Sequence, residues 1–81
     1  MVVRVIFFSY FKELAGTGGL DIEVTAGVTL GELVDSLLQR YPRLEPMRNS
    51  MLKAVGVDYQ DAFYVLRPGD EVSLFPPVQG G

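Results

Sequence analysis

The sequence has 81 residues, of which 48% are hydrophobic and 11% aromatic, and it contains neither cysteine nor histidine. A chain of this length forms one domain with a modest core, and this composition argues against intrinsic disorder. The chain thus lacks a thiol nucleophile, the commonest general base and the commonest metal ligands, so we expect no metal site, no bound cofactor and no self-contained enzyme. The formal charge of −3 argues against nucleic acid, which binds basic faces, and favours a partner protein with a complementary basic surface.

The N-terminal segment reads MVVRVIFF, which is short, is broken by Arg4 and passes directly into a pattern typical of folded structure. We therefore expect it to be part of the domain and not a signal peptide. No stretch approaches the roughly 18 apolar residues that a membrane-spanning helix needs. These features predict a cytoplasmic protein with no membrane partner.

The first predicted element is a strand over Val2 to Phe8, which is rich in β-branched and aromatic residues. Successive side chains of a strand point to opposite faces, so Val3, Val5 and Phe7 share one face. The other face carries Val2, Arg4, Ile6 and Phe8. Because Arg4 needs water, we expect this second face to be the exposed one.

A short helical turn is predicted next, from Lys12 to Ala15, with Ser9 as its N-cap and Gly16 at its end. The segment from Leu20 to Thr25 then alternates apolar and polar residues, which predicts a second strand. Its inward-facing residues are expected to be Leu20, Ile22 and Val24.

The main helix has the clearest pattern in the sequence. Thr29, followed three residues later by Glu32, forms a capping box that marks the start of the helix. Apolar residues then recur at the spacing of one buried helical stripe: Leu30, Leu33, Val34, Leu37, Leu38 and Tyr41. Pro42 cannot continue a helix, so the helix is expected to end before it.

The second half of the sequence predicts an irregular connection over 42–50, a strand from Leu52 to Val57 and a polar turn over 58–61. A short strand or extended piece follows over 63–66, Pro68 and Gly69 form a turn, and Glu71 to Phe75 is the last strand. This order of elements predicts an α+β fold in which one main helix covers one face of a small mixed sheet.

The last seven residues read FPPVQGG and carry the strongest functional signal. Pro76 and Pro77 lack a backbone N–H, so they end the last strand, and the residues after Phe75 can reach up to ~20 Å if extended. Gly80 and Gly81 lack Cβ, so backbone there can enter a narrow channel. We expect a globular domain over 1–75 and a projecting tail over 76–81, whose terminal carboxylate is activated in another protein's active site. The alternative is a frayed terminus without a function.

Four segments resemble the small-subunit family of molybdopterin synthase: RVIFFSYFKELAGT near the start, MLKAVGVDYQ, RPGDEVSLFPP and the terminal FPPVQGG. The resemblance implies a β-grasp, ubiquitin-like fold and a sulfur carrier that holds sulfur as a C-terminal thiocarboxylate. It also implies that Gly81 is adenylated and then thiocarboxylated, and that Gly80 is its required neighbour.

The same resemblance implies three partners. An E1-like adenylating enzyme activates the tail, a sulfurtransferase or cysteine desulfurase supplies sulfur, and a larger catalytic subunit of molybdopterin synthase receives it. The chain itself is then a sulfur-donating subunit of a transferase, with catalysis in the larger subunit and with ATP and magnesium bound by the activating enzyme.

Partner contacts are predicted beside the tail. β-Grasp folds place the first and last strands side by side, and Phe8 and Phe75 lie on the faces expected to be exposed. We therefore expect an apolar docking surface made by Phe8, Phe75, Pro76, Pro77 and Val78. The alternative is that the two phenylalanines are half-buried sheet residues beneath a loop.

Three other functions stay open. The chain departs from the family at Gly56, where the family commonly has a polar residue, often asparagine, and this keeps open a carrier for thiamine thiazole or tRNA thiolation. A ubiquitin-like modifier would use the same activated Gly81 on a substrate lysine. An interaction module would have an inert tail.

Overall fold

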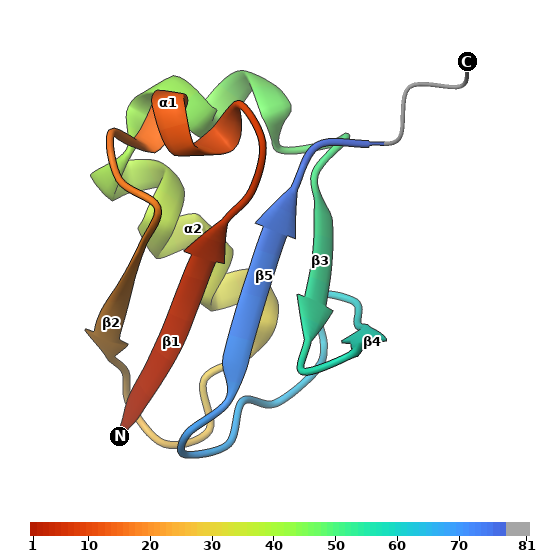
Figure 1. The fold of residues 1–81 in the computed structure, drawn as a ribbon. Coiled ribbons are helices and arrows are strands. Elements are labelled where there is room, and N and C mark those ends of the chain that lie inside the picture. The colour runs from red at the N-terminus through yellow and green to blue at the C-terminus, as the bar shows by residue number, and fades with distance from the viewer. Residues whose placement is uncertain (78–81) are drawn as a thin grey trace.

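The centre of the sheet is built from the first and last strands of the domain (Figure 1). The computed structural model describes residues 1–77. Strand β1 (Val2–Phe7) pairs antiparallel with β2 (Gly19–Glu23) and parallel with β5 (Glu71–Phe75). Strand β5 also pairs antiparallel with β3 (Leu52–Val55), which pairs with β4 (Asp58–Tyr59). The order β2-β1-β5-β3-β4 makes the mixed sheet that the sequence predicts.

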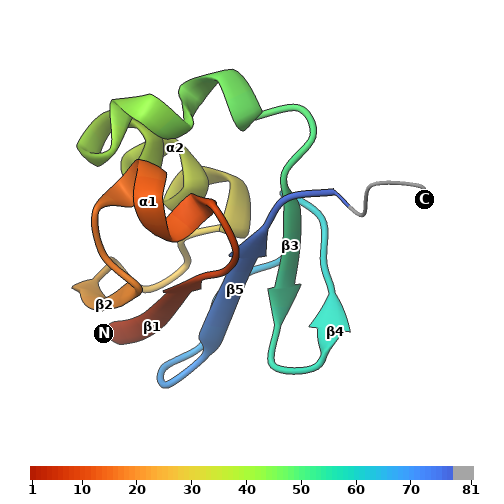
Figure 2. The same cartoon turned by 45° about the horizontal axis from the view of Figure 1, so that its top comes forward.

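One long helix, α2 (Leu30–Arg40), crosses one face of this sheet (Figures 1 and 2). It begins with the predicted capping box: the backbone N–H of Glu32 donates to Thr29 Oγ1 at 3.2 Å, and the backbone N–H of Thr29 donates to Glu32 Oε1 at 3.0 Å. A short helix, α1 (Phe11–Ala15), and a 3₁₀ helix, η1 (Pro42–Met47), lie at one end of the same layer. Among residues 1–77, no helix is long and apolar enough to cross a membrane.

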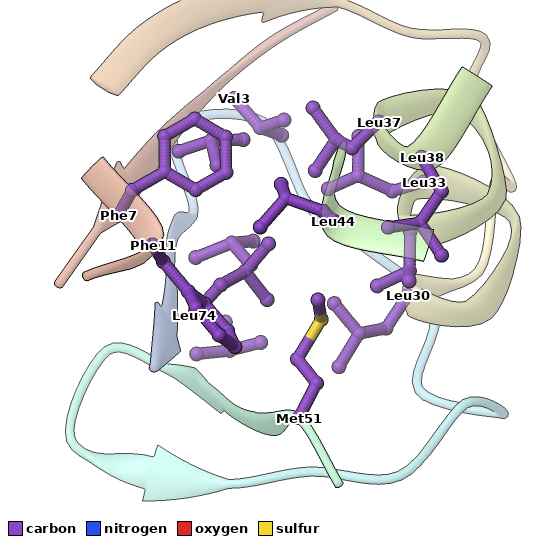
Figure 3. Packing of buried hydrophobic residues seen from close by; sticks show 14 of the residues in the cluster. Val3, Phe7, Phe11, Leu30, Leu33, Leu37, Leu38, Leu44, Met51 and Leu74 are labelled. Atoms are coloured by element: carbon purple, nitrogen blue, oxygen red, sulfur yellow. The ribbon is translucent and has the colours of Figure 1, made fainter. Parts of the chain in front are cut away.

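The core lies between α2 and the sheet face that carries Val3, Val5 and Phe7, all of which are fully buried (Figure 3). The helix contributes the predicted stripe to it: Leu30, Leu33, Val34, Leu37 and Leu38. Tyr41 at the end of the stripe is half-buried, and its ring meets that of Phe7 edge-on at 5.4 Å between centroids. On the opposite face Arg4 is exposed and forms an ion pair with Asp21 at 3.2 Å. The predicted assignment of the two faces of β1 is confirmed.

The capping box gives a stability prediction. Thr29→Ala removes the oxygen that accepts the Glu32 N–H, so the free energy of unfolding should fall by about 1 kcal/mol. Thr25→Ala is the matched control, because Thr25 is exposed and a surface substitution is expected to stay within about ±0.5 kcal/mol. Denaturant melts of the two variants measure the difference, and equal melts would show that the cap contributes nothing.

The predicted cap at Ser9 is wrong. Ser9 has a φ of 56°, Tyr10 occupies the N-cap position of α1, and no side chain caps this helix. The turn is made by backbone groups instead, since the N–H of Phe11 donates to Phe8 O and that of Lys12 to Ser9 O, each at 3.1 Å. The end of α1 is as predicted, because Gly16 there has a φ of 77°, which glycine adopts without strain.

The second half of the chain is more ordered than the sequence predicts. The connection after α2 forms η1, which starts at Pro42 and buries Leu44. Arg48 at its end donates to both carboxylate oxygens of Glu45, at 2.9 and 3.0 Å, and this holds the pKa of Glu45 below its usual value.

The short strand or extended piece predicted over 63–66 does not form a regular strand. Its only strand pairing among residues 1–77 is a single antiparallel bridge between Val65 and Thr29.

The prediction of a polar turn over 58–61 is wrong for its first two residues, which form a strand. Strand β3 ends at Val55, earlier than predicted, and the chain reverses through Gly56 and Val57 into β4. The ladder pairs Val55 with Asp58 and Ala54 with Tyr59. A two-residue loop with Gly first is typical of a tight hairpin, and this loop brings Tyr59 onto the sheet.

Candidate functional site

Phe8 and Phe75 meet on the face of the sheet that α2 does not cover. The parallel register pairs Phe7 with Leu74, and the N–H of Phe8 donates to Leu74 O at 3.0 Å, so Phe8 continues the ladder past the end of β1. The two rings meet edge-on with centroids 6.1 Å apart, a favoured geometry for aromatic pairs. Phe8 is 42% exposed and Phe75 is half-buried. Both rings are accessible, and no described loop buries them.

Tyr59 extends this pair into a cluster that the sequence does not predict. Its ring lies 5.9 Å from that of Phe75, and the side chain is 67% exposed. We call Phe8, Tyr59 and Phe75 the aromatic patch. Beside it lies a shallow groove of about 450 Å³, lined by Phe8, Ala54, Gly56, Val57, Tyr59, Ser73 and Phe75. The signal that could have revealed Tyr59 is Gly56, since a hairpin there sets Tyr59 opposite Ala54 on the open face.

The aromatic patch adjoins the start of the C-terminal segment. Phe75 is the last residue of β5, and the half-buried Pro76 and Pro77 follow it directly. The other predicted site residues, Val78, Gly80 and Gly81, lie outside the described residues. The structure thus brings Phe8 and Phe75 into contact, with the two prolines next in the chain, and adds Tyr59 and Val57.

The chemistry of the groove is that of a binding surface. None of its lining residues is charged, and Val57 at its rim is 97% exposed. Exposed aromatic side chains that cluster around a shallow pocket are typical anchors of protein interfaces. Among residues 1–77, no cluster of three or more acidic side chains is placed to hold a metal ion. The arrangement can hold an apolar surface of another protein beside the end of β5.

The backbone conformation at Gly56 favours glycine over residues that carry a Cβ. Its φ is 60° and an added Cβ would meet no atom within 4 Å. Glycine and asparagine are the residues that adopt a positive φ most readily. The glycine therefore meets the positive φ that the loop between β3 and β4 requires.

Comparison with known proteins decides the family. The family model described as ThiS matches residues 5–81, nearly the whole chain. The chain belongs to the ThiS family. A curated relative from Mycobacterium tuberculosis, a molybdopterin synthase sulfur carrier subunit, is 38% identical to this ThiS-family chain over 80 residues, covering 98% of the chain and 96% of the relative.

Solved structures agree with this ThiS-family membership. SAMP1 from Haloferax volcanii matches with a TM-score of 0.89 at 25% identity, and all of both chains is covered. A chain from the complex of subunits 1 and 2 of the molybdopterin-converting factor of Helicobacter pylori matches with a TM-score of 0.73 at 29% identity, again with full coverage of both chains. The predicted β-grasp fold and the resemblance to the molybdopterin synthase small-subunit family are both confirmed.

Proposed function

We propose that this chain is a sulfur carrier and acts as the small subunit of molybdopterin synthase. The observation that carries the proposal is the aromatic patch at the end of β5, from which the sequence runs through Pro76 and Pro77 to Gly80 and Gly81. Such a surface can dock the domain on a partner while the tail enters the partner's active site. The name of the Mycobacterium tuberculosis relative and the two-subunit complex from Helicobacter pylori support this role.

The reaction on the tail has two steps. A carboxylate oxygen of Gly81 attacks the α-phosphorus of ATP, which releases pyrophosphate and leaves an acyl-adenylate. The terminal sulfur of a persulfide on the sulfur donor then attacks the Gly81 carbonyl carbon and displaces AMP, which leaves an acyl disulfide. A cysteine thiol of the partner enzymes attacks the donor sulfur of that disulfide, forms a new disulfide with it and releases Gly81 as the thiocarboxylate. Gly80 and Gly81 suit both steps, because residues without Cβ let backbone approach ATP and the sulfur donor closely.

The domain and the tail have separate roles in this proposal. Residues 1–75 form the globular docking domain and residues 76–81 the projecting tail. Phe8, Phe75, Pro76, Pro77 and Val78 make the partner contacts, and Tyr59 joins them. The partners are an E1-like adenylating enzyme, a sulfurtransferase or cysteine desulfurase, and a larger catalytic subunit that passes the sulfur to a pterin precursor. We place these reactions in the cytoplasm, where ATP-dependent activation takes place.

Intact-mass analysis tests the proposed reaction. Incubation with the adenylating enzyme, ATP and a sulfur donor should replace one oxygen of the chain by sulfur, and fragmentation should locate the change in the C-terminal peptide. The matched control omits ATP and should leave the mass unchanged. An unmodified chain, under conditions in which the same enzyme activates another carrier, would contradict the sulfur-carrier proposal.

A second candidate function is protein modification, which the match to SAMP1, a small archaeal modifier protein, favours. The same acyl-adenylate of Gly81 would then pass to a lysine of another protein and form an isopeptide bond. Peptides from cells in which a lysine carries the C-terminal segment of this chain, joined through Gly81 by an isopeptide bond, would select the modifier. A carrier for thiazole synthesis or tRNA thiolation would be recognised by its acceptor. The thiocarboxylate would then be consumed by the purified enzyme of that pathway and not by the larger subunit of molybdopterin synthase.

A further inference from the structure

The outer edge of β2 offers backbone groups to a partner. In an antiparallel ladder, opposed residues alternate between pairs that exchange hydrogen bonds and pairs that do not. Met1 and Val24 form an exchanging pair, with N–H to O distances of 2.7 and 2.9 Å, and the N–H of Phe7 donates to Gly18 O at 3.0 Å. The alternation between these points leaves the backbone groups of Gly19, Asp21 and Glu23 pointing away from β1.

Two of these three residues have unpaired edge groups. The N–H and C=O of Gly19 are bonded to the hydroxyl of Thr17, at 3.4 and 3.0 Å. Within residues 1–77, the outward backbone N–H and C=O groups of Asp21 and Glu23 form no hydrogen bond with a side chain or with another segment of backbone. Figures 1 and 2 both show β2 at the margin of the sheet, with no strand beyond it. Asp21 and Glu23 therefore present two donors and two acceptors to an added strand.

A groove of about 690 Å³ runs along this edge on the α2 side. Half-buried side chains of Ile22, Val24 and Val28 line it together with Glu23 and Glu32. An added strand would direct alternate side chains toward this partly apolar groove. Its other side chains would lie on the open face, near the exposed carboxylates of Asp21 and Glu23.

We propose that the edge of β2 binds an extended segment of a partner protein in which aliphatic residues alternate with lysine or arginine. The charges select this occupant over a second copy of the chain. Asp21 is paired with Arg4, but Glu23 has no ion pair among residues 1–77, and pairing two β2 edges would bring it close to the acidic residues of the other copy. The aromatic patch lies just past the end of β1 and on β4 and β5, so this surface is distinct from it. The inference does not depend on the chemistry of Gly81.

Amide exchange on the intact chain tests the proposal with a capped hexapeptide of alternating valine and lysine. In the free chain, the amides of Asp21 and Glu23 should exchange rapidly and those of Leu20 and Ile22 slowly. Saturating peptide should slow exchange at Asp21 and Glu23 by about tenfold or more. The same peptide with alternate backbone nitrogens methylated, and a peptide of alternating valine and glutamate, should both fail to do so.

A pair of variants separates the backbone from the charge. Glu23→Pro removes the outward N–H at a position where an edge strand tolerates proline, and Glu23→Gln removes only the charge. Glu23→Pro should bind the peptide about three- to tenfold more weakly than Glu23→Gln, the effect of one lost hydrogen bond. Equal binding by the two variants, or equal binding of the methylated peptide to the unaltered chain, would overturn the proposal. Protection of Asp21 and Glu23 by raising the protein concentration alone would also overturn it, in favour of a second copy.

Discussion

Deleting Gly81 is expected to abolish sulfur transfer while leaving the melting temperature nearly unchanged. The deletion moves the terminal carboxyl group one residue back to Gly80, about 3.3–3.6 Å short of its proposed place, so no thiocarboxylate is expected at the new terminus. The buried core cluster of the described residues runs from Val3 to Leu74, so the free energy of unfolding should change by no more than about ±0.5 kcal/mol. Mass analysis of the product and thermal melts of the two chains measure both effects.

A chain with one alanine added after Gly81 is the control for this deletion. It keeps every residue of the native sequence but moves the carboxyl group beyond its proposed place, so it should also fail to accept sulfur. Normal thiocarboxylation of the extended chain would contradict the requirement for a terminal Gly-Gly. A large loss of stability on deletion would show that the terminal segment is packed structure and not a projecting tail.

Phe75→Ala is expected to weaken binding to the larger subunit by ~2–4 kcal/mol, or roughly thirty- to a thousandfold in affinity. Phe75 lies between Phe8 and Tyr59 in the aromatic patch, so its loss removes the centre of the proposed interface. The isolated domain should lose less stability than the ~3–5 kcal/mol of a core Phe→Ala substitution, because the ring is only half-buried. Titration against the purified larger subunit and denaturant melts give the two numbers.

Phe7→Ala provides the matched control on the opposite face of the sheet. Phe7 is fully buried and its ring contacts Tyr41, so this variant should destabilise the fold strongly and affect binding only through unfolding. If Phe75→Ala melts as badly as Phe7→Ala yet binds normally when folded, Phe75 is a core residue and the docking assignment fails.

Periodicity predicts the elements whose faces differ in polarity. Leu30, Leu33 and Leu37 recur on one side of α2, and Arg4 alone is enough to assign the exposed face of β1. The β3–β4 hairpin was not predicted, because β4 has only two residues and both are exposed. A strand this short shows no alternation of apolar and polar side chains. Its existence depends on the loop conformation at Gly56 and on pairing with β3, which are tertiary effects.

The residues of the candidate site differ in the same way in how far the sequence predicts them. The adjacency of Phe8 and Phe75 was predictable, because the polarity of each strand fixes its face and the resemblance to β-grasp proteins sets the two strands side by side. Tyr59 was not predicted, since it reaches the patch only through the hairpin, whose signal in the sequence is Gly56. Ser9 shows the converse case, in which a good capping residue is displaced because the backbone at that position has a φ of 56°.

The parallel pairing of β1 with β5 makes the docking surface depend on the folding of the whole domain. Residues 4 and 71 are neighbours in this ladder, so the centre of the sheet cannot close until the last strand has left the ribosome. Contacts between such distant segments form late and slowly in folding. Phe8 and Phe75 therefore come together only in a folded domain, whereas the Gly-Gly sequence is also present in an unfolded chain. A partner that requires the aromatic patch as well as the tail would reject unfolded copies of the carrier without a separate quality-control step.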